Sequence, residues 1–137
     1  MAIGRSFEEA IQKGIRMIGQ GMHGFVGNVL KTKDIDEELV NPTDSRIFAI
    51  AGAFDKGYSV EKIHELTKID HWFLQRLENI HLLKEELSKF DKETDISECL
   101  LRKAKQYGFS DFQIARAIGL DGDVEKGMML VRQFRKD

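Results

Sequence analysis

The sequence has little proline, cysteine or excess charge. Pro42 and Cys99 are the single representatives of their types among 137 residues. A lone cysteine cannot form an internal disulfide, so a disulfide-stapled secreted domain is excluded and a reducing, intracellular compartment is favoured. No apolar run is long enough to span a membrane, and no signal-peptide core is found near the N-terminus. With 21 basic and 23 acidic residues, there is neither a basic arm for nucleic acid nor an acidic tail.

The residues that are abundant favour helices over strands. Valine is scarce, with six residues, whereas leucine, isoleucine, alanine, lysine and glutamate dominate. A chain of this length forms one domain and buries a core without needing a metal ion or a disulfide. We therefore predict an all-α fold over residues 1–137, with about seven helices in an orthogonal helical bundle.

Local signals place the first helix and the segment after it. Ser6 and Glu9 match a capping box in which the Glu9 carboxylate reaches back to the Ser6 amide, and the helix should end near Gly19. The glycine-rich and then charged residues 20–42 predict a long exposed connector. Its apolar side chains would fold over the body of the domain: Phe25, Val26, Val29 and Leu30.

Further helices are predicted after Pro42, each from a capping residue. Thr43 or Asp44 begins one, and the residues that begin the later ones are Ser59, Asp70, Asp95 and Ser110. The last helix carries Val124, Met128, Val131 and Phe134. In the long helix after Asp70, the predicted apolar stripe contains Phe73, Leu77, Ile80, Leu83 or Lys84, and Leu87, with Trp72 and Leu74 beside it.

A weak internal repeat has an offset of 51 residues. Gly57-Tyr58-Ser59 matches Gly108-Phe109-Ser110, and Ile63 matches Ile114. In each unit the glycine frees the backbone for a turn, and the serine can cap the next helix. The two units resemble helix-turn-helix modules. A true duplication and a repeated use of the same turn chemistry both explain the pattern.

The helix-turn-helix pattern gives an alternative function, nucleic-acid binding. A DNA-reading helix needs basic or amide side chains in a basic field. The candidate third helix instead begins His71-Trp72-Phe73, which is typical of a core helix. Basic residues near the C-terminus are offset by acidic neighbours. We therefore expect no nucleic-acid partner.

The residues that could carry chemistry do not form a recognised site. Gly19-x-Gly21-x-x-Gly24 follows a helix rather than a strand, so it lacks the context of a phosphate loop. The histidines show no metal-ligand spacing; a turn is predicted between His64 and His71. Cys99 is expected to be a buried structural thiol. Adjacent acidic residues such as Glu8-Glu9 are expected to be solvated, since neighbours on a helix do not face each other. We predict no catalytic, cofactor-binding or metal-binding residues.

Several segments resemble one protein family. Met1–Lys13 is similar to the M-A-I-G-R-[TS]-F-E-E-x-x-Q-K segment of the large subunit of carbamoyl-phosphate synthase, and Ile69–Leu74 resembles that family's I-D-x-W-F-L signature. Pro42–Ala51 and Ala104–Ala115 match the same domain, in order. The proline-threonine-aspartate stretch is most similar to eukaryotic-type synthases, among them the multifunctional kind of the pyrimidine pathway.

The resemblance implies a non-catalytic oligomerisation domain. In that family the domain joins two ATP-dependent synthetase halves, which make carbamoyl phosphate from bicarbonate, ammonia (from glutamine) and two ATP, in pyrimidine or arginine biosynthesis. ATP and Mg²⁺ would belong to those halves and not to this domain. The implied partners are the flanking synthetase domains and a further copy of the chain, and residues 1–5 would be a remnant of the preceding ATP-grasp domain. The implied location is cytoplasmic rather than mitochondrial.

The signature segment supplies the candidate anchor residues, which are Trp72, Phe73 and Leu74. Each could serve an interface or simply pack in the core. If the Trp72 ring is buried, Trp72→Ala should destabilise the fold by about 3–5 kcal/mol.

Overall fold

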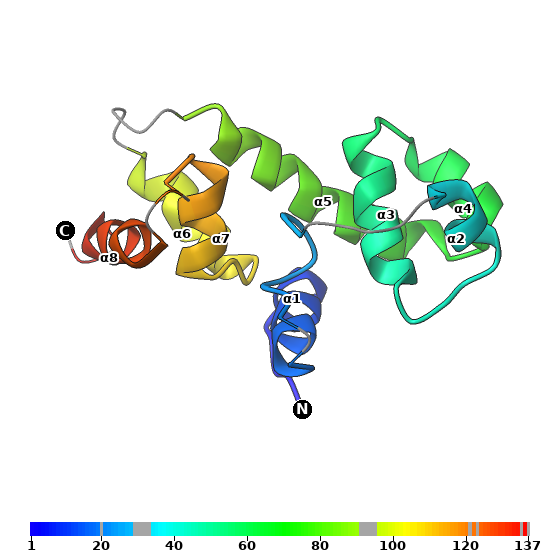
Figure 1. The fold of residues 1–137 in the computed structure, drawn as a ribbon, viewed down its shortest axis with the longest axis horizontal. Coiled ribbons are helices and arrows are strands. Elements are labelled where there is room, and N and C mark those ends of the chain that lie inside the picture. Colours follow the sequence, from blue (N-terminus) through cyan, green and yellow to red (C-terminus); the bar gives the residue numbers. More distant parts are fainter. Residues whose placement is uncertain are drawn as a thin grey trace.

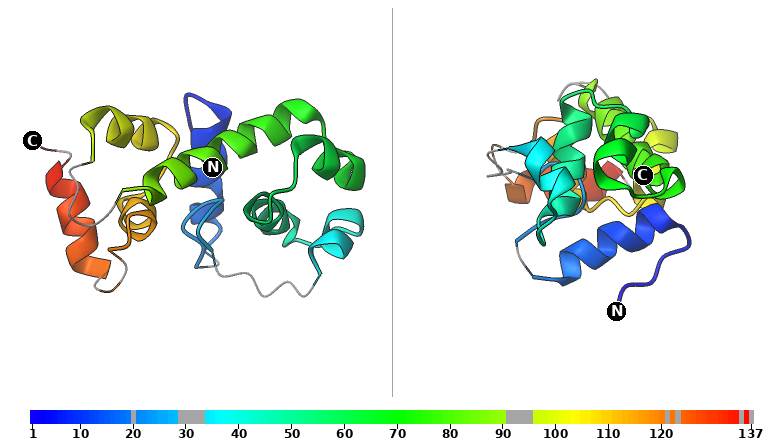
Figure 2. Two further views of the ribbon diagram at one scale, coloured as in Figure 1. Left: turned by 90° about the horizontal axis from the view of Figure 1, so that it is seen from above. Right: turned by 90° about the vertical axis from the view of Figure 1, so that its right-hand side faces the viewer.

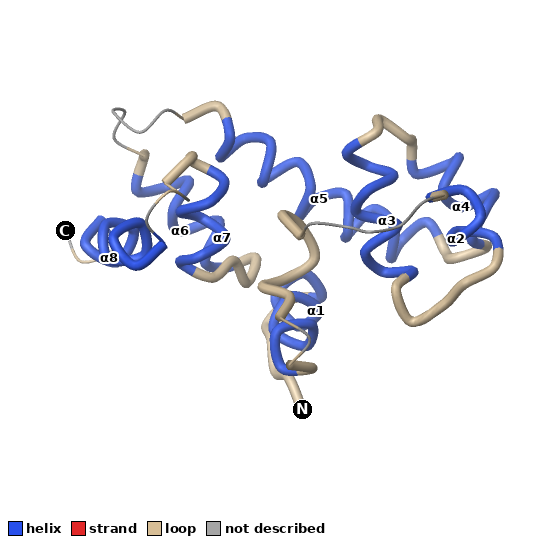
Figure 3. Tube along the Cα trace, in the orientation of Figure 1, coloured by secondary structure: helices blue, strands red, loops and turns tan. Residues whose placement is uncertain are grey.

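The computed structural model describes residues 1–19, 21–28, 34–90, 96–120, 122, 124–134 and 136. This part of the chain contains eight helices and no strand (Figure 3), so the predicted all-α class is confirmed with one helix more than expected. The helices are α1 (Phe7–Met17), α2 (Ile35–Val40), α3 (Arg46–Asp55), α4 (Val60–Thr67), α5 (His71–Ser88), α6 (Glu98–Gln106), α7 (Asp111–Ala117) and α8 (Val124–Phe134).

Helix α5 connects the two ends of an elongated bundle. Figure 1 shows α2, α3 and α4 at one end, α6, α7 and α8 at the other, and α1 below the middle. α5 packs against α1, α3, α4 and α7, and the views in Figure 2 show α1 crossing it steeply. One continuous core joins these elements; its fully buried members include Phe25, Leu39, Ile63, Leu74, Ile80, Leu83, Leu87, Ile114 and Val131.

The predicted caps are mostly confirmed. Ser6, Ser59 and Asp70 accept backbone hydrogen bonds at the starts of α1, α4 and α5, and Ser110 and Gln113 form a complete capping box on α7. Two predicted starts differ. α3 begins after Ser45 rather than Thr43 or Asp44, and α6 begins after Ser97; Asp95 lies outside the described residues.

The Glu9 carboxylate makes a different contact from the one predicted. It accepts a hydrogen bond from the Arg5 amide at 2.7 Å, and not from the Ser6 amide. It also pairs with Lys13 one turn along the helix. The Arg5 amide and then the Lys13 ammonium hold the pKa of Glu9 below its usual value. These contacts tie the N-terminal segment to the first turns of α1.

The two turns of the sequence repeat adopt the same geometry. Gly57 and Gly108 both have φ of +82°, in the left-handed region that glycine favours. The next amide in each unit bonds back five residues at 3.0 Å, from Tyr58 to Ala53 and from Phe109 to Ala104. The serine that follows in each unit is extended and caps the next helix. The repeat is therefore present in the structure as well as in the sequence.

The predicted long connector is wrong for residues 35–40, which form α2. Asp34 caps this helix with hydrogen bonds to the Asp36 and Glu37 amides, and the acidic first turn complements the helix dipole. Leu39 is fully buried, so packing stabilises a helix that is short by itself. Phe25 and Val26 are buried as predicted, whereas Val29 and Leu30 lie outside the described residues.

A buried pair of glutamines connects distant parts of the chain. The Gln113 amide donates to the Gln12 carbonyl oxygen at 2.9 Å, which also accepts from the Phe25 amide at 3.1 Å. Gln12 in turn donates to the Tyr107 carbonyl at 3.1 Å. Gly24 lies so close that a Cβ there would collide with both glutamine side chains. The pair therefore fixes α1, the 22–28 segment and α7 relative to one another.

Candidate interaction surface

The three predicted anchor residues divide between the core and the surface. Leu74 is fully buried, whereas Trp72 is 50% exposed and Phe73 is 44% exposed. The buried stripe of α5 consists of Leu74, Leu77, Ile80, Leu83 and Leu87. The prediction of Phe73 in this stripe is therefore wrong. Leu74 takes its place. Successive buried residues are three or four positions apart, so the buried side winds around α5 toward different neighbouring helices.

Trp72 and Phe73 form an aromatic cluster with Phe7 at the crossing of α1 and α5. The Phe7 ring lies 5.7 Å from the Trp72 ring and 5.6 Å from the Phe73 ring, both centroid to centroid, and Trp72 and Phe73 are 5.0 Å apart at 88°. The Arg76 guanidinium lies 5.0 Å from the Trp72 ring centroid. Such tilted and cation–π contacts orient the rings. We call Phe7, Trp72, Phe73 and Arg76 the aromatic surface.

A buried carboxylate lies beside this surface. Glu8 is only 3% exposed, so the expectation that it is solvated is wrong. Its Oε1 accepts a hydrogen bond from Asn79 at 3.0 Å and lies 3.7 Å from the Arg76 guanidinium. A buried carboxylate needs such partners because losing water is costly for a charge. These contacts fix α1 against the N-terminal half of α5.

Helix α8 carries a second exposed apolar surface. Met129 is 69% exposed, and its neighbours Met128 and Leu130 are about 40% exposed. The helix packs mainly against α7, with Val131 as its fully buried side chain. Methionine adapts its shape readily to a partner. We call Met128, Met129 and Leu130 the α8 surface.

One cluster of metal-ligand types occurs among the described residues. Ligand atoms of Asp55, His81 and Glu85 lie within 4.8 Å of one another. The Lys84 ammonium lies 2.6 Å from Asp55 and 3.5 Å from Glu85, so it already provides the positive charge there. The cluster is therefore a lysine-centred ion-pair group. The i, i+4 spacing of His81 and Glu85 could have indicated their shared face, but Asp55 on α3 could not have been found from spacing.

Two other predicted positions differ in their surroundings. His64 and His71 stack at 3.9 Å between ring centroids despite the turn between them, and His64 Nδ1 lies 2.7 Å from the Ile69 carbonyl. Cys99 is exposed rather than buried, because α6 turns Leu100, Leu101 and Ala104 toward the core.

Two observations bear on the alternatives. No helix of the described residues combines the length and apolar character needed to cross a membrane. The start of α5 exposes His71, Trp72 and Phe73, so the expectation that this segment begins a core helix is wrong. An exposed aromatic face suits contact with a protein, where aromatic side chains are enriched.

Comparison with known proteins identifies the family. Residues 1–137 match the carbamoyl-phosphate synthetase large chain, oligomerisation domain. The chain is 51% identical to the multifunctional protein pyr1-3 of Dictyostelium discoideum, over 99% of this chain and 6% of that protein. It is 46% identical to the multifunctional protein URA2 of Saccharomyces cerevisiae, over 100% of this chain and 6% of that protein.

A bacterial relative is shorter. The carbamoyl phosphate synthase large chain, N-terminal section, of Aquifex aeolicus is 39% identical over 100% of this chain and 23% of that protein. The chain thus spans a small part of each relative's length. These matches confirm the resemblance seen in the sequence and support the scaffold interpretation, not the nucleic-acid alternative. The chain belongs to the family of carbamoyl-phosphate synthetase large chain oligomerisation domains.

Proposed function

We propose that the chain is the non-catalytic domain joining the two ATP-dependent synthetase halves of a carbamoyl-phosphate synthase. The whole protein would make carbamoyl phosphate from bicarbonate, ammonia released from glutamine and two ATP, with ATP and Mg²⁺ bound by the halves. The match over residues 1–137 and the small share of each relative that it covers support this role.

The relatives include arginine-specific large chains as well as multifunctional proteins. The arginine-specific large chain of Neurospora crassa, named as mitochondrial, is 44% identical, below the 51% of the multifunctional Dictyostelium protein. The two kinds overlap in identity, because the arginine-specific large chain of Eremothecium gossypii is 48% identical and URA2 is 46% identical. We propose a cytoplasmic location for the whole protein from its similarity to the multifunctional proteins. Fractionation of the source cells, with immunodetection of the chain, tests that location.

The observation that carries the proposed role is the exposed aromatic surface. Phe7 is separated only by Ser6 from residues 1–5, which we propose to be the end of the preceding synthetase domain. Met1 and Ile3 in that segment are 101% and 74% exposed. Trp72 and Phe73 lie against Phe7, so they are close to where the preceding domain would be attached. We assign the aromatic surface to contact with that flanking synthetase domain.

Binding between separately produced domains tests this assignment. The 137-residue chain is titrated with the N-terminal synthetase half in a calorimeter. Trp72→Ala should weaken binding by at least roughly tenfold, which is usual for a tryptophan at the centre of an interface. Leu82→Ala is the matched control, because Leu82 is 56% exposed on the same helix. Equal affinity of the Trp72→Ala and Leu82→Ala variants would contradict the assignment.

We assign self-association to the α8 surface. Three neighbouring apolar side chains are exposed there at the end of the bundle away from α2, α3 and α4 (Figure 1). Sedimentation equilibrium over a wide concentration range should show the 15.7 kDa chain forming a larger species. Met129→Glu should abolish the larger species, and Met17→Glu, on the exposed side of α1, should not. A strict monomer at the highest concentration would refute self-association of this chain.

A further inference from the structure

A cavity of about 360 Å³ lies between the 22–28 segment, α5 and α7, on a different part of the bundle from the aromatic surface. Its volume falls within the range of small-molecule sites, roughly 300–1,000 Å³. Three sequence-distant elements build it, and two of them are joined where the Gln113 side-chain amide donates to the Val26 carbonyl at 3.5 Å. Its wall is partly apolar, from Val26 and Phe112.

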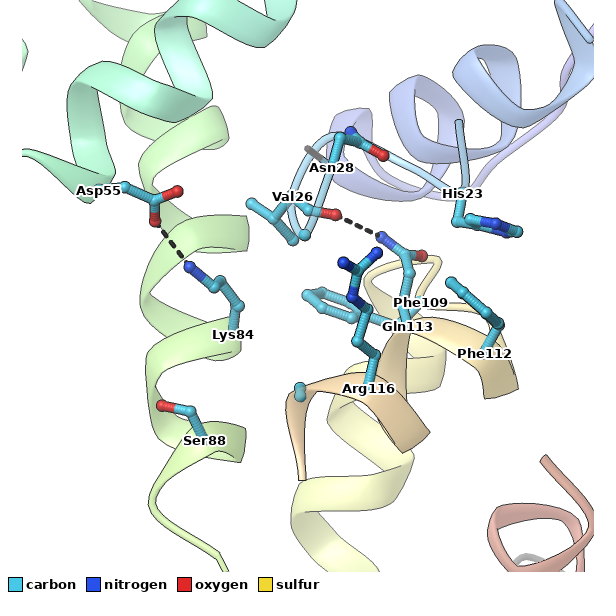
Figure 4. A pocket seen from close by; sticks show the side chains of 12 residues that line it. His23, Val26, Asn28, Asp55, Lys84, Ser88, Phe109, Phe112, Gln113 and Arg116 are labelled. Carbon is cyan, nitrogen blue, oxygen red and sulfur yellow. Dashed lines mark hydrogen bonds and ion pairs between the residues drawn. The ribbon is translucent and has the colours of Figure 1, made fainter. Parts of the chain in front are cut away.

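Arg116 is the unusual residue of this cavity. Figure 4 shows its guanidinium rising from α7 toward the 22–28 segment. Within the described residues its guanidinium has no hydrogen bond or ion pair, whereas the guanidinium groups of the other half-buried arginines are engaged. Arg16 donates to the Gly108 carbonyl at 2.7 Å, Arg46 donates to the Leu39 carbonyl at 2.8 Å, and Arg76 faces Glu8. A guanidinium offers five donors, so Arg116 is equipped to bind an oxyanion.

The charges around the cavity favour an anion. Lys84 extends from α5 on the opposite wall, and Asp55 is the acidic residue of the lining (Figure 4). Lys84 and Asp55 neutralise each other through their 2.6 Å contact, so the Arg116 charge is left uncompensated. The His23 ring lies near this positive charge. Burial, and then the positive charges of Arg116 and Arg16, lower the pKa of the ring.

We propose that this cavity binds a small organic oxyanion, with its charged group on Arg116 and its apolar portion against Val26 and Phe112. The oxyanion would accept paired hydrogen bonds from the guanidinium, for which a phosphate or a carboxylate has suitable geometry. The apolar wall selects an organic anion over an inorganic one. This site goes beyond the scaffold role and does not depend on the aromatic surface.

Calorimetric titration of the 137-residue chain at constant ionic strength tests the proposal. The probes are phenyl phosphate, benzoate, inorganic phosphate and benzyl alcohol. We expect phenyl phosphate or benzoate to bind more tightly than inorganic phosphate and benzyl alcohol, and the stronger of the two identifies the charged group. Binding of benzyl alcohol as tight as that of both anions would overturn the proposal, and so would an absence of saturable binding by either anion.

Variants of Arg116 separate the site from general attraction of anions. Arg116→Gln should weaken binding of the preferred probe by roughly tenfold or more, and Arg116→Lys should weaken it less because the charge is kept. Arg102→Gln is the control, since Arg102 is an exposed arginine that pairs with Glu98 away from the cavity. Urea unfolding of each variant verifies the fold. Equal losses in Arg116→Gln and Arg102→Gln would overturn the assignment to this cavity.

Discussion

The buried glutamine pair gives a stability prediction that can be worked out bond by bond. Gln12 is fully buried and satisfies three partners: the Phe25 amide, the Gln113 amide and the Tyr107 carbonyl. Leucine has a volume similar to that of glutamine, but in Gln12→Leu it can form none of these three hydrogen bonds. An unsatisfied buried polar group costs about 1–3 kcal/mol, and partial relaxation reduces the sum. We expect a loss of about 2–4 kcal/mol in the free energy of unfolding.

Gln113→Leu should be similarly costly. Its carbonyl oxygen accepts from the Ser110 amide at 3.1 Å, completing the α7 cap, and lies 3.3 Å from the Arg16 guanidinium. The bond between Gln113 and Gln12 is lost in either single variant and is counted twice when the two losses are added. The double variant should therefore be less destabilised than the sum, by about 1 kcal/mol.

Urea unfolding followed by far-ultraviolet circular dichroism measures all three variants. The slope of the free energy of unfolding against urea concentration should be the same in all variants, so that differences in the midpoints measure differences in stability. Gln75→Leu is the control: Gln75 is exposed on α5 and should change stability by no more than about 0.5 kcal/mol. A loss below that size for Gln12→Leu, or strict additivity in the double variant, would refute the role given to the pair.

Three other predictions use the same unfolding assay. Gly57→Ala should lower the free energy of unfolding by about 1–2 kcal/mol through its positive φ alone. Gly108→Ala should lower it further, because a Cβ there would lie 3.0 Å from the Glu9 backbone; equal losses would contradict this. Leu74→Ala should cost about 3–5 kcal/mol, but Trp72→Ala only about 2 kcal/mol, since half of the ring is already exposed; the reverse order would place the ring in the core. The folded-state pKa of His23 lies below its ordinary value, so the unfolded state takes up the proton first and stability falls as the pH drops through about 6.5. His23→Asn should reduce this loss of stability, measured between about pH 7.5 and about pH 5.5. An unchanged loss would contradict the prediction.

Features encoded by neighbouring residues could be predicted from the sequence. Ser59, Asp70 and Ser110 each cap the helix that directly follows, which requires only a few residues of context. The repeated glycine-aromatic-serine turn was predictable for the same reason. In both units, the glycine supplies the positive φ and the serine supplies the cap.

Features that depend on contacts across the chain could not be predicted in this way. α2 is short and strongly acidic, and its stability depends on the burial of Leu39 by other helices. Glu8 looked like an ordinary surface carboxylate, but α5 covers it and provides Asn79 and Arg76. Arg116 gave no local signal either, since its cavity needs the 22–28 segment and α5 to come together.

The three residues of the signature motif on α5 have different surroundings in the structure. The family signature drew attention to Trp72, Phe73 and Leu74 together, yet α5 turns Leu74 into the core and the two aromatic side chains outward. Successive residues are about 100° apart around a helix, so one short motif can serve both packing and contact. Leu74 should therefore affect mainly stability. Trp72 should affect binding to a synthetase half more than stability.

The position of α5 explains why packing and contact are combined there. The helix has 18 residues, about 27 Å in length, and its buried face contacts helices from both ends of the bundle. Its first turn also carries the aromatic surface. A force applied to that surface by a neighbouring domain would thus be transmitted to both ends through one rigid element. Such a helix suits a domain that holds two larger units in a fixed relation, because the surfaces it connects cannot move independently without unpacking the core.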